Sequence, residues 1–334
     1  MRFITLVAGI AAMTVTLFAG AAEPIVIKFS HVVAPNTPKG MGAEKFKALA
    51  EQYTEGAVRV EVYPNSSLYK DKEEMEALQL GAVELIAPSL AKFGPLGVRE
   101  FEAFDLPYIF DSYADLHKVT QGALGRRMFE GLESRGIKGL AYWDNGFKSF
   151  SANTPIRVPA DLKGRKMRIQ SSKVLDAQMR ALGALPQVTA FSEVYLALRA
   201  GVVEGTENPH SNFYTQRMHE TQKHMTLTEH GYLGYAVITT EKFWDSLPGS
   251  VRDALERAMR EATAYTNRIA KAENDKALAA VEAAGTTEIH VPTSDERRAF
   301  KKALLPVHRQ MAPRIGSDLI EAIYEETGFD PEKL

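Results

Sequence analysis

The stretch IVIKFS at residues 25–30, followed by VRVEVY at residues 58–63, sets the class of the fold. The first is a run rich in β-branched residues, as in a buried strand, and the second alternates as a strand does. Between them, apolar residues from Ala43 to Tyr53 recur at helical spacing. A strand, a helix and a second strand in this order predict a β-α-β unit.

The same alternation continues along the chain. Helices are predicted at residues 73–80, 116–132, 173–182 and 192–199, and strands at residues 83–87, 137–143, 166–170 and 235–239. Alternating elements predict an α/β fold with mixed, mostly parallel sheets that carry helices on both faces.

The length of 334 residues favours two lobes, because one compact core rarely grows so large. The texture changes at Asn145-Gly146, where a stretch rich in Ser, Asn and Pro begins, and the strand at 235–239 returns to the first lobe. Two such crossings predict hinge strands in a periplasmic-binding-protein architecture. We expect one lobe from residues 23–145 plus about 232–270, and the other from residues 146–231 plus about 271–334.

Residues 251–284 contain no proline or glycine and predict one long helix that ends at Gly285. At 1.5 Å per residue it is about 50 Å long, which suits a helix that spans both lobes. Its apolar stripe has alternating spacings of four and three residues: Val251, Leu255, Ala258, Ala262, Tyr265, Ile269 and Ala272. The same stripe is compatible with a coiled-coil dimer seam.

The N-terminus has the pattern of a signal peptide at residues 1–22. Arg2 precedes an apolar run from Phe3 to Phe18, and small residues follow before Glu23. A transmembrane anchor is the alternative, but the run is shorter than the roughly 20 residues of a spanning helix.

The chain has no cysteine, so disulfides and thiolate zinc sites are excluded. Export without disulfides favours a bacterial periplasm.

Composition and motifs exclude several function classes. The formal net charge of -2 argues against nucleic-acid binding. Glycine-rich nucleotide loops, the H-E-x-x-H zinc motif and the G-x-S-x-G nucleophile motif are absent from the sequence. We therefore predict no catalytic residues, no metal and no cofactor. A catalytic triad assembled from distant residues, as in a secreted hydrolase, remains an alternative.

Arg168 is the best candidate for holding a carboxylate. It lies between Met167 and Ile169 in a predicted strand, and a guanidinium pairs bidentately with two carboxylate oxygens. The alternation of the strand alone is equally compatible with an arginine that faces solvent.

Five segments together resemble the DctP family of solute-binding proteins, which serve tripartite ATP-independent periplasmic (TRAP) transporters. They are KFSH at residues 28–31, LQLGAV at 78–83, FDLPYIF at 104–110, LKGRKMR at 162–168 and VVEGTEN at 202–208. The resemblance covers nearly the whole chain after residue 22. It implies two α/β lobes, a long helix across both, and closure over an organic acid.

The resemblance also implies roles for particular residues. The carboxylate-binding arginine of the family corresponds to Arg168, and a common ligand-contacting asparagine corresponds to Asn208. Where many relatives have a second arginine, this chain has Lys148. The remaining candidates around the ligand are His31, Lys39, Ser89, Lys92, Asn145, Gln170, Asn212 and Phe213, with Tyr232 as a weaker one.

The similarity is strongest to the branch that binds four-carbon dicarboxylates, which implies succinate, fumarate or malate and leaves their order open. Lys39 and Lys92 are alternatives for the distal carboxylate, against a surface position for each. The expected partners are the membrane subunits of a TRAP transporter, and the expected state is a monomer. A module that presents its ligand to a receptor kinase predicts the same cleft.

Overall fold

The computed structural model describes residues 23–333 of the chain. The predicted signal peptide, at residues 1–22, lies outside the described residues. Among the described helices, none is both long enough and apolar enough to cross a membrane.

The strands are β1 (Ile25–Ser30), β2 (Val58–Tyr63), β3 (Leu85–Ile86), β4 (Ile137–Ala152), β5 (Lys166–Ile169), β6 (Leu185–Val188), β7 (Gly205–Asn208), β8 (His224–Thr240) and β9 (Glu288–His290). The helices are α1 (Pro38–Tyr53), α2 (Glu74–Gln79), α3 (Tyr113–Gln121), α4 (Ala123–Glu133), α5 (Lys173–Ala181), α6 (Val194–Arg199), α7 (His210–Thr215), α8 (Glu241–Ser246), α9 (Gly249–Ala284), α10 (Ser294–Leu304), α11 (Pro306–Ile315) and α12 (Ser317–Thr327). Short 3₁₀ helices are η1 (Leu90–Lys92), η2 (Gly94–Leu96), η3 (Arg99–Asp105), η4 (Pro159–Leu162), η5 (Phe191–Glu193) and η6 (Met218–Glu220).

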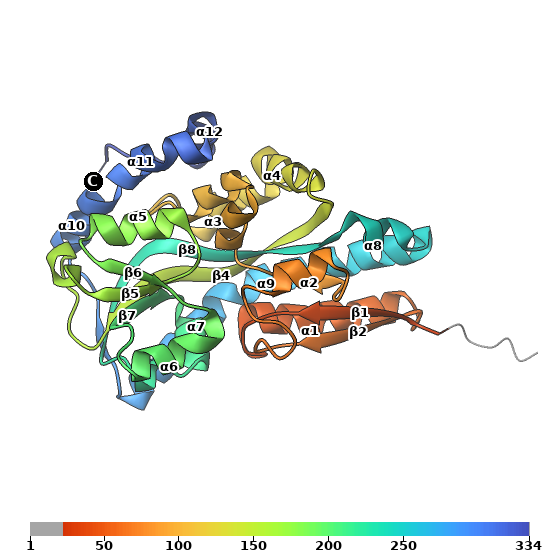
Figure 1. Cartoon of the computed structure of the whole chain (residues 1–334), viewed down its shortest axis with the longest axis horizontal. Coiled ribbons are helices and arrows are strands. Elements are labelled where there is room, and N and C mark those ends of the chain that lie inside the picture. The colour runs from red at the N-terminus through yellow and green to blue at the C-terminus, as the bar shows by residue number, and fades with distance from the viewer. Residues whose placement is uncertain (1–22, 334) are drawn as a thin grey trace, which may run out of the picture.

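Within residues 23–333 the strands form one nine-stranded sheet in the order β2-β1-β3-β8-β4-β7-β5-β6, with β9 beside β8. Strands β2, β1 and β3 are parallel and form a first arm, and β7, β5 and β6 are parallel and form a second arm. Between the arms lie β4 and β8, which pair antiparallel to each other and to the arm beside them. The chain therefore has a mixed α/β sheet with parallel arms on either side of an antiparallel centre (Figure 1).

The two central strands are longer than the sequence predicted. Strand β4 continues nine residues beyond the predicted end at Trp143, and β8 begins at His224. The predicted crossing at Asn145-Gly146 lies inside β4, where the pairing with β8 shifts register. The change in composition there marks an irregularity in one continuous strand, because ladder hydrogen bonds resume on both sides of it. Figure 1 shows both strands running across the molecule from one arm to the other.

Helices α1, α3 and α4 begin or end where the sequence did not predict. Helix α1 begins at Pro38, because Thr37 caps it by accepting a hydrogen bond from the backbone N–H of Gly40 at 3.2 Å. The single helix predicted at 116–132 is wrong: α3 and α4 are separated by Gly122, which has an extended backbone. A lone glycine in an apolar pattern therefore marked a break between two helices.

The long helix α9 ends at Ala284 with Gly285 as its cap, as predicted, and Gly285 has a left-handed backbone. The second half of its predicted apolar stripe is wrong, because Ala272 is exposed while Thr266, Ala270 and Asn274 are buried. A seven-residue repeat drifts around a straight helix, which has 3.6 residues per turn. The buried face packs against α1, β4 and α7 of the same chain, which span both arms.

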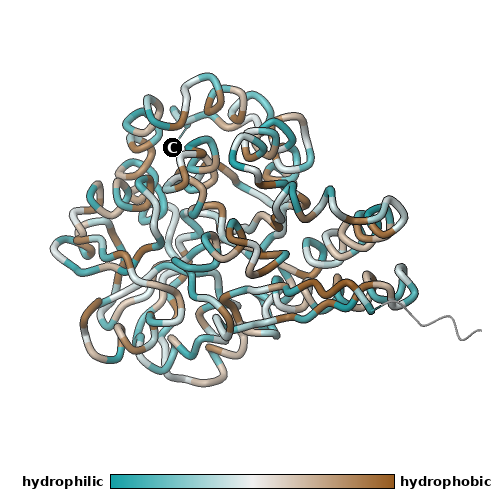
Figure 2. Tube along the Cα trace, turned by 45° about the vertical axis from the view of Figure 1, so that its right-hand side comes forward, coloured by the Kyte–Doolittle hydropathy of each residue, from teal (hydrophilic) through white to brown (hydrophobic). Residues whose placement is uncertain are grey.

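The hydrophobic core is divided in the same way as the sheet. One cluster packs β1 and β2 against α1 and α9, and another packs α3, α4, α11 and α12 over the other face of the central strands. Two further clusters belong mainly to the second arm and the helices that follow it. Figure 2 shows that most helices carry hydrophobic and hydrophilic residues within each turn, as amphipathic helices with one buried face do. The fold is therefore two-lobed, with β4, β8 and α9 passing between the lobes.

Candidate functional site

A cavity between the two arms brings together half of the predicted site residues. It encloses about 300 Å³ of empty space, including the part open to solvent. Residues from the first arm, the second arm and β8 line it: Val32, Val33, Lys39, Asp71, Ser89, Arg168, Gln170, Phe191, Asn208, Asn212, Leu233 and Tyr235. Its wall therefore includes six of the candidates that the sequence predicted.

Arg168 lies on β5 and is only 2% exposed. Its Nε and Nη2 both donate to the carbonyl oxygen of Thr189, at 3.0 and 2.9 Å. The ring of Phe191 lies 5.8 Å from the centre of its guanidinium. Burial lowers the pKa of Arg168, while the carboxylates of Asp71 and Glu207 oppose that shift. The solvent-facing alternative is thus wrong, and Nη1 makes no hydrogen bond within the described chain.

Lys39 is the second buried cation of the wall, in the first turn of α1. Its Nζ donates to the carbonyl oxygen of Ala87 at 2.8 Å and lies 3.8 Å from the centre of the Tyr235 ring. Burial lowers the pKa of Lys39 to about 8, although the nearby carboxylates of Glu74 and Asp71 oppose the shift. Lys39 is therefore buried and does not have the surface position that the sequence left open, in which its ammonium group would extend into water.

Two acidic side chains accompany these cations. Asp71 is 8% exposed, and its Oδ2 lies 3.4 Å from Nζ of Lys92. Burial favours the neutral form of Asp71, but Lys92 and Arg168 outweigh it and lower its pKa. Glu74 is buried with neither carboxylate oxygen hydrogen-bonded within the described chain, and burial raises its pKa to about 8.

Uncharged polar groups complete the wall. The amide of Gln170 donates to the hydroxyl of Ser89 at 2.8 Å, a contact between the two arms. Asn208 ends β7, and its amide donates to the hydroxyl of Thr206 at 3.1 Å. These groups offer both donors and acceptors, as a site for an oxygen-rich ligand requires.

Asn145 supports the wall from behind. Its amide nitrogen donates to the side-chain oxygen of Asn212 at 2.9 Å and to the hydroxyl of Tyr235 at 2.8 Å. Its side-chain oxygen accepts a hydrogen bond from the hydroxyl of Ser211 at 2.8 Å. Asn145 thus fixes two residues of the cavity wall without being part of it.

The other predicted candidates lie outside the wall. Lys92 borders it through Asp71, and Lys148 is buried in an ion pair with Glu207 at 2.8 Å. His31 is fully buried, and burial lowers its pKa to about 3, so it stays neutral. Phe213 belongs to a hydrophobic cluster, and the hydroxyl of Tyr232 donates to Asp144 at 2.7 Å.

Sequence reasoning missed several residues of the wall. Asp71 stands in the charged run KDKEE, which reads as a solvated turn, and Tyr235 was assigned only to a strand. The apolar members Val32, Val33, Phe191 and Leu233 carried no chemical signal. An acid flanked by lysines gives no sign in the sequence that it is buried, because its partners Lys92 and Arg168 are distant along the chain.

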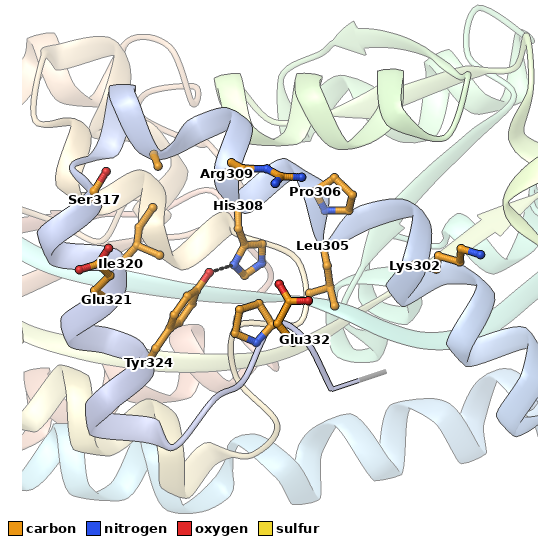
Figure 3. A pocket seen from close by; sticks show the side chains of 12 residues that line it. Lys302, Leu305, Pro306, His308, Arg309, Ser317, Ile320, Glu321, Tyr324 and Glu332 are labelled. Carbon is orange, nitrogen blue, oxygen red and sulfur yellow. Dashed lines mark hydrogen bonds between the residues drawn. The ribbon is translucent and has the colours of Figure 1, made fainter.

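Two larger cavities have different characters. The one in Figure 3 is lined only by residues of 302–332, on α10, α11, α12 and the C-terminal tail, and there His308 hydrogen-bonds the hydroxyl of Tyr324 at 2.6 Å. The other has as many acidic as basic side chains, with Lys271, Arg297 and Lys301 among the basic ones. Within the described residues, no cluster of three or more His, Asp or Glu could hold a metal ion.

The chain is similar to a known family and to solved structures. Residues 29–314 match the family described as DctP, bacterial extracellular solute-binding protein, family 7. The C4-dicarboxylate-binding periplasmic protein DctP of Rhodobacter capsulatus is 64% identical and covers 98% of each chain.

Solved structures agree with that match. A TRAP periplasmic solute-binding protein from Shewanella oneidensis with bound succinate is 39% identical, has a TM-score of 0.89 and covers 91% of this chain and 99% of its own. One from Pseudomonas aeruginosa with bound L-malate is 41% identical, has a TM-score of 0.84 and covers 86% of this chain and 100% of its own. The chain belongs to the DctP family of bacterial extracellular solute-binding proteins.

Proposed function

We propose that this protein is an extracytoplasmic solute-binding protein that captures a four-carbon dicarboxylate between its arms and delivers it to the membrane subunits of a TRAP transporter. The observation that carries the proposal is the cavity between the arms, where Arg168 and Lys39 are buried beside hydrogen-bonding side chains. The relative named above is a C4-dicarboxylate-binding protein, and the similar structures hold succinate or L-malate.

The charges of the site suit a dianion. Arg168 and Lys39 keep their charge near neutral pH, Asp71 is ionised, and Glu74 is neutral because its pKa is raised to about 8. Lys92, which pairs with Asp71, is the third basic side chain. Three cations and one carboxylate leave two net positive charges. A ligand with two carboxylates would balance them, and a buried charge is stable only when it is balanced.

The geometry suggests separate roles for the cations. Thr189 occupies the Nε edge of the Arg168 guanidinium, so the Nη1 side is left for one carboxylate. Lys39 and Lys92 are the candidates for the distal carboxylate, with Lys39 in the wall and Lys92 beside it. Ser89, Gln170, Asn208 and Asn212 would satisfy the remaining oxygen lone pairs.

The energies are sufficient for a transport protein. A charge-assisted hydrogen bond contributes roughly 1.5–3 kcal/mol, and micromolar affinity requires about 8 kcal/mol net. Several such bonds in a closed cleft reach that value after the cost of ordering. The site is built for binding and release, so we infer that the protein is not an enzyme and that residues 1–22 direct its export to the periplasm.

Calorimetric titration of the protein lacking residues 1–22 tests the proposal, with succinate, fumarate and L-malate against acetate and the longer acid adipate. We expect micromolar or tighter binding of the four-carbon acids and at least about tenfold weaker binding of acetate, which can meet only one end of the site. Equal affinity for acetate and succinate would contradict a two-ended dicarboxylate site.

A further inference from the structure

An ionised carboxylate lies in the wall of a cavity that is proposed to hold anions. Asp71 faces the cavity with Arg168 and Lys39, and its pKa is lowered, so it keeps its charge. On its own this charge repels a dianionic ligand. Because Asp71 weakens the attraction between the site and an anionic ligand, its position in the wall calls for a role other than direct ligand binding.

The hydrogen bond made by Asp71 joins the two arms. Asp71 lies in the turn between β2 and α2, on the first arm, and its Oδ2 accepts from the backbone N–H of Phe191 at 2.8 Å. Phe191 begins the short helix η5, which follows strand β6 of the second arm. Backbone N–H groups at the start of a helix lack partners within it, so the carboxylate satisfies a donor that otherwise has none within residues 23–333.

The segment from Thr189 to Phe191 connects this contact to the arginine. The carbonyl oxygen of Thr189 accepts two hydrogen bonds from Arg168, and the ring of Phe191 flanks the guanidinium. The same segment is therefore held by Arg168 on the second arm and by Asp71 on the first. Closing the cleft at Asp71 fixes the backbone that positions Arg168.

Two other polar contacts cross the cleft near Asp71, beside the apolar packing of Val32 and Val33 in one cluster with Phe191. Lys70 pairs with Glu193 at 3.4 Å, with both side chains about half exposed, and such pairs contribute little. Gln170 and Ser89 are uncharged. Of these three polar contacts, the one between Asp71 and Phe191 alone combines burial with an ionised acceptor, so it is the strongest of the three.

We propose that Asp71 is a positioning residue that acts as a latch: its hydrogen bond to the backbone N–H of Phe191 holds the first arm to the second and so controls how fast the bound acid leaves. This proposal rests on the function proposed above. It adds that a residue without a direct bond to the ligand determines the lifetime of the closed state.

The proposal is tested by stopped-flow dissociation of succinate from Asp71→Asn and Asp71→Ala. Asp71→Asn makes the site more positive by one charge but weakens the acceptor, and Asp71→Ala removes the acceptor. A latch predicts faster dissociation in both, by roughly 10- to 100-fold for Asp71→Ala and less for Asp71→Asn. Unchanged or slower dissociation in Asp71→Asn would overturn the latch, because it would show that Asp71 acts only as a repelling charge.

A control variant and a measurement without ligand complete the test. Lys70→Gln breaks the exposed pair at the same cleft and is expected to change the dissociation rate less than about threefold. Small-angle scattering of the unliganded proteins should show a more open Asp71→Ala than wild type, and identical profiles would count against the latch. If the wild type binds no dicarboxylate, the proposed function fails while the scattering comparison still decides the latch.

Discussion

Arg168 and Lys148 are both buried cations from neighbouring parts of the sheet, but they have opposite surroundings. Arg168 donates to a carbonyl oxygen, has no carboxylate within hydrogen-bonding distance in the described chain, and lines the cavity. Lys148 is paired with Glu207, whose other oxygen lies 2.8 Å from Nε2 of His230. A buried cation is available to an incoming anion only when the protein has not already neutralised it.

The backbone explains why Lys148 is enclosed. Lys148 on β4 faces Gly231 on β8, and a Cβ added to Gly231 would lie 2.8 Å from the lysine Cε. The glycine therefore makes room for the lysine stem between the strands. Burial by itself favours the neutral form of Glu207, but Lys148 and His230 lower its pKa to about 2. The pair therefore joins the central strand β4 to β7 of the second arm.

The largest effect is expected from breaking the Lys148 pair. Lys148→Met leaves the Glu207 carboxylate buried without its cation, which costs about 3–5 kcal/mol of unfolding free energy. Dicarboxylate affinity of the folded fraction should change by less than about threefold, within the range of an indirect effect. Denaturant unfolding and calorimetric titration measure the two quantities.

The matched control is the double variant Lys148→Met with Glu207→Gln. Removing both charges together should recover part of the lost stability, because no unpaired charge remains. A Lys148→Met protein that is stable but no longer binds succinate would instead identify Lys148 as a ligand anchor.

Arg168 is expected to behave in the opposite way. Arg168→Ala should weaken dicarboxylate binding by about 2–5 kcal/mol, roughly 30- to several-thousand-fold in the dissociation constant. Arg168→Lys keeps the charge but loses the planar fork, so it should also bind weakly. Unliganded stability should fall less than in Lys148→Met, because no carboxylate is paired with Arg168. Near-native affinity in Arg168→Ala would place the anchor at Lys39 or Lys92.

The contrast between Arg168 and Lys148 also shows which features of the site can be predicted from the sequence. Motif resemblance named Arg168, Asn208 and Lys39, and these line one cavity. The same resemblance also named Lys148, which is not in the cavity wall. Its partner Glu207 is 59 residues away, so the pairing across β4 and β7 could not be inferred from local sequence.

The fold was predictable where local patterns decide it. The strands at 25–30 and 58–63 have the predicted bounds, since alternation and β-branched composition act within a few residues. The full lengths of β4 and β8 were not predictable, because they follow from pairing between segments far apart in the chain. The burial of Asp71 depends in the same way on Lys92, Arg168 and Phe191.

The smallest expected effect is the pH dependence of dicarboxylate affinity at Lys39, which shares features with both Arg168 and Lys148. Like Arg168 it lines the cavity, and like Lys148 it has a buried acid near it, since Glu74 is the strongest of the charges that act on it. Lys39 loses its proton, and Glu74 becomes ionised, as the pH rises through about 8. Both changes make the site less positive, so affinity for a dianion should fall with rising pH.

The expected fall is at most about tenfold per pH unit above 8 for each proton taken up on binding. Asp71 and His31 face the same pair but have lowered pKa values and do not titrate in this range. Titrations with succinate at pH 7, 8 and 9 measure the slope, and Glu74→Gln, which removes one of the two titrating groups, should reduce it. An affinity that is constant from pH 7 to 9 would mean that Lys39 keeps its charge over this range, paired with Glu74 and not available to the ligand.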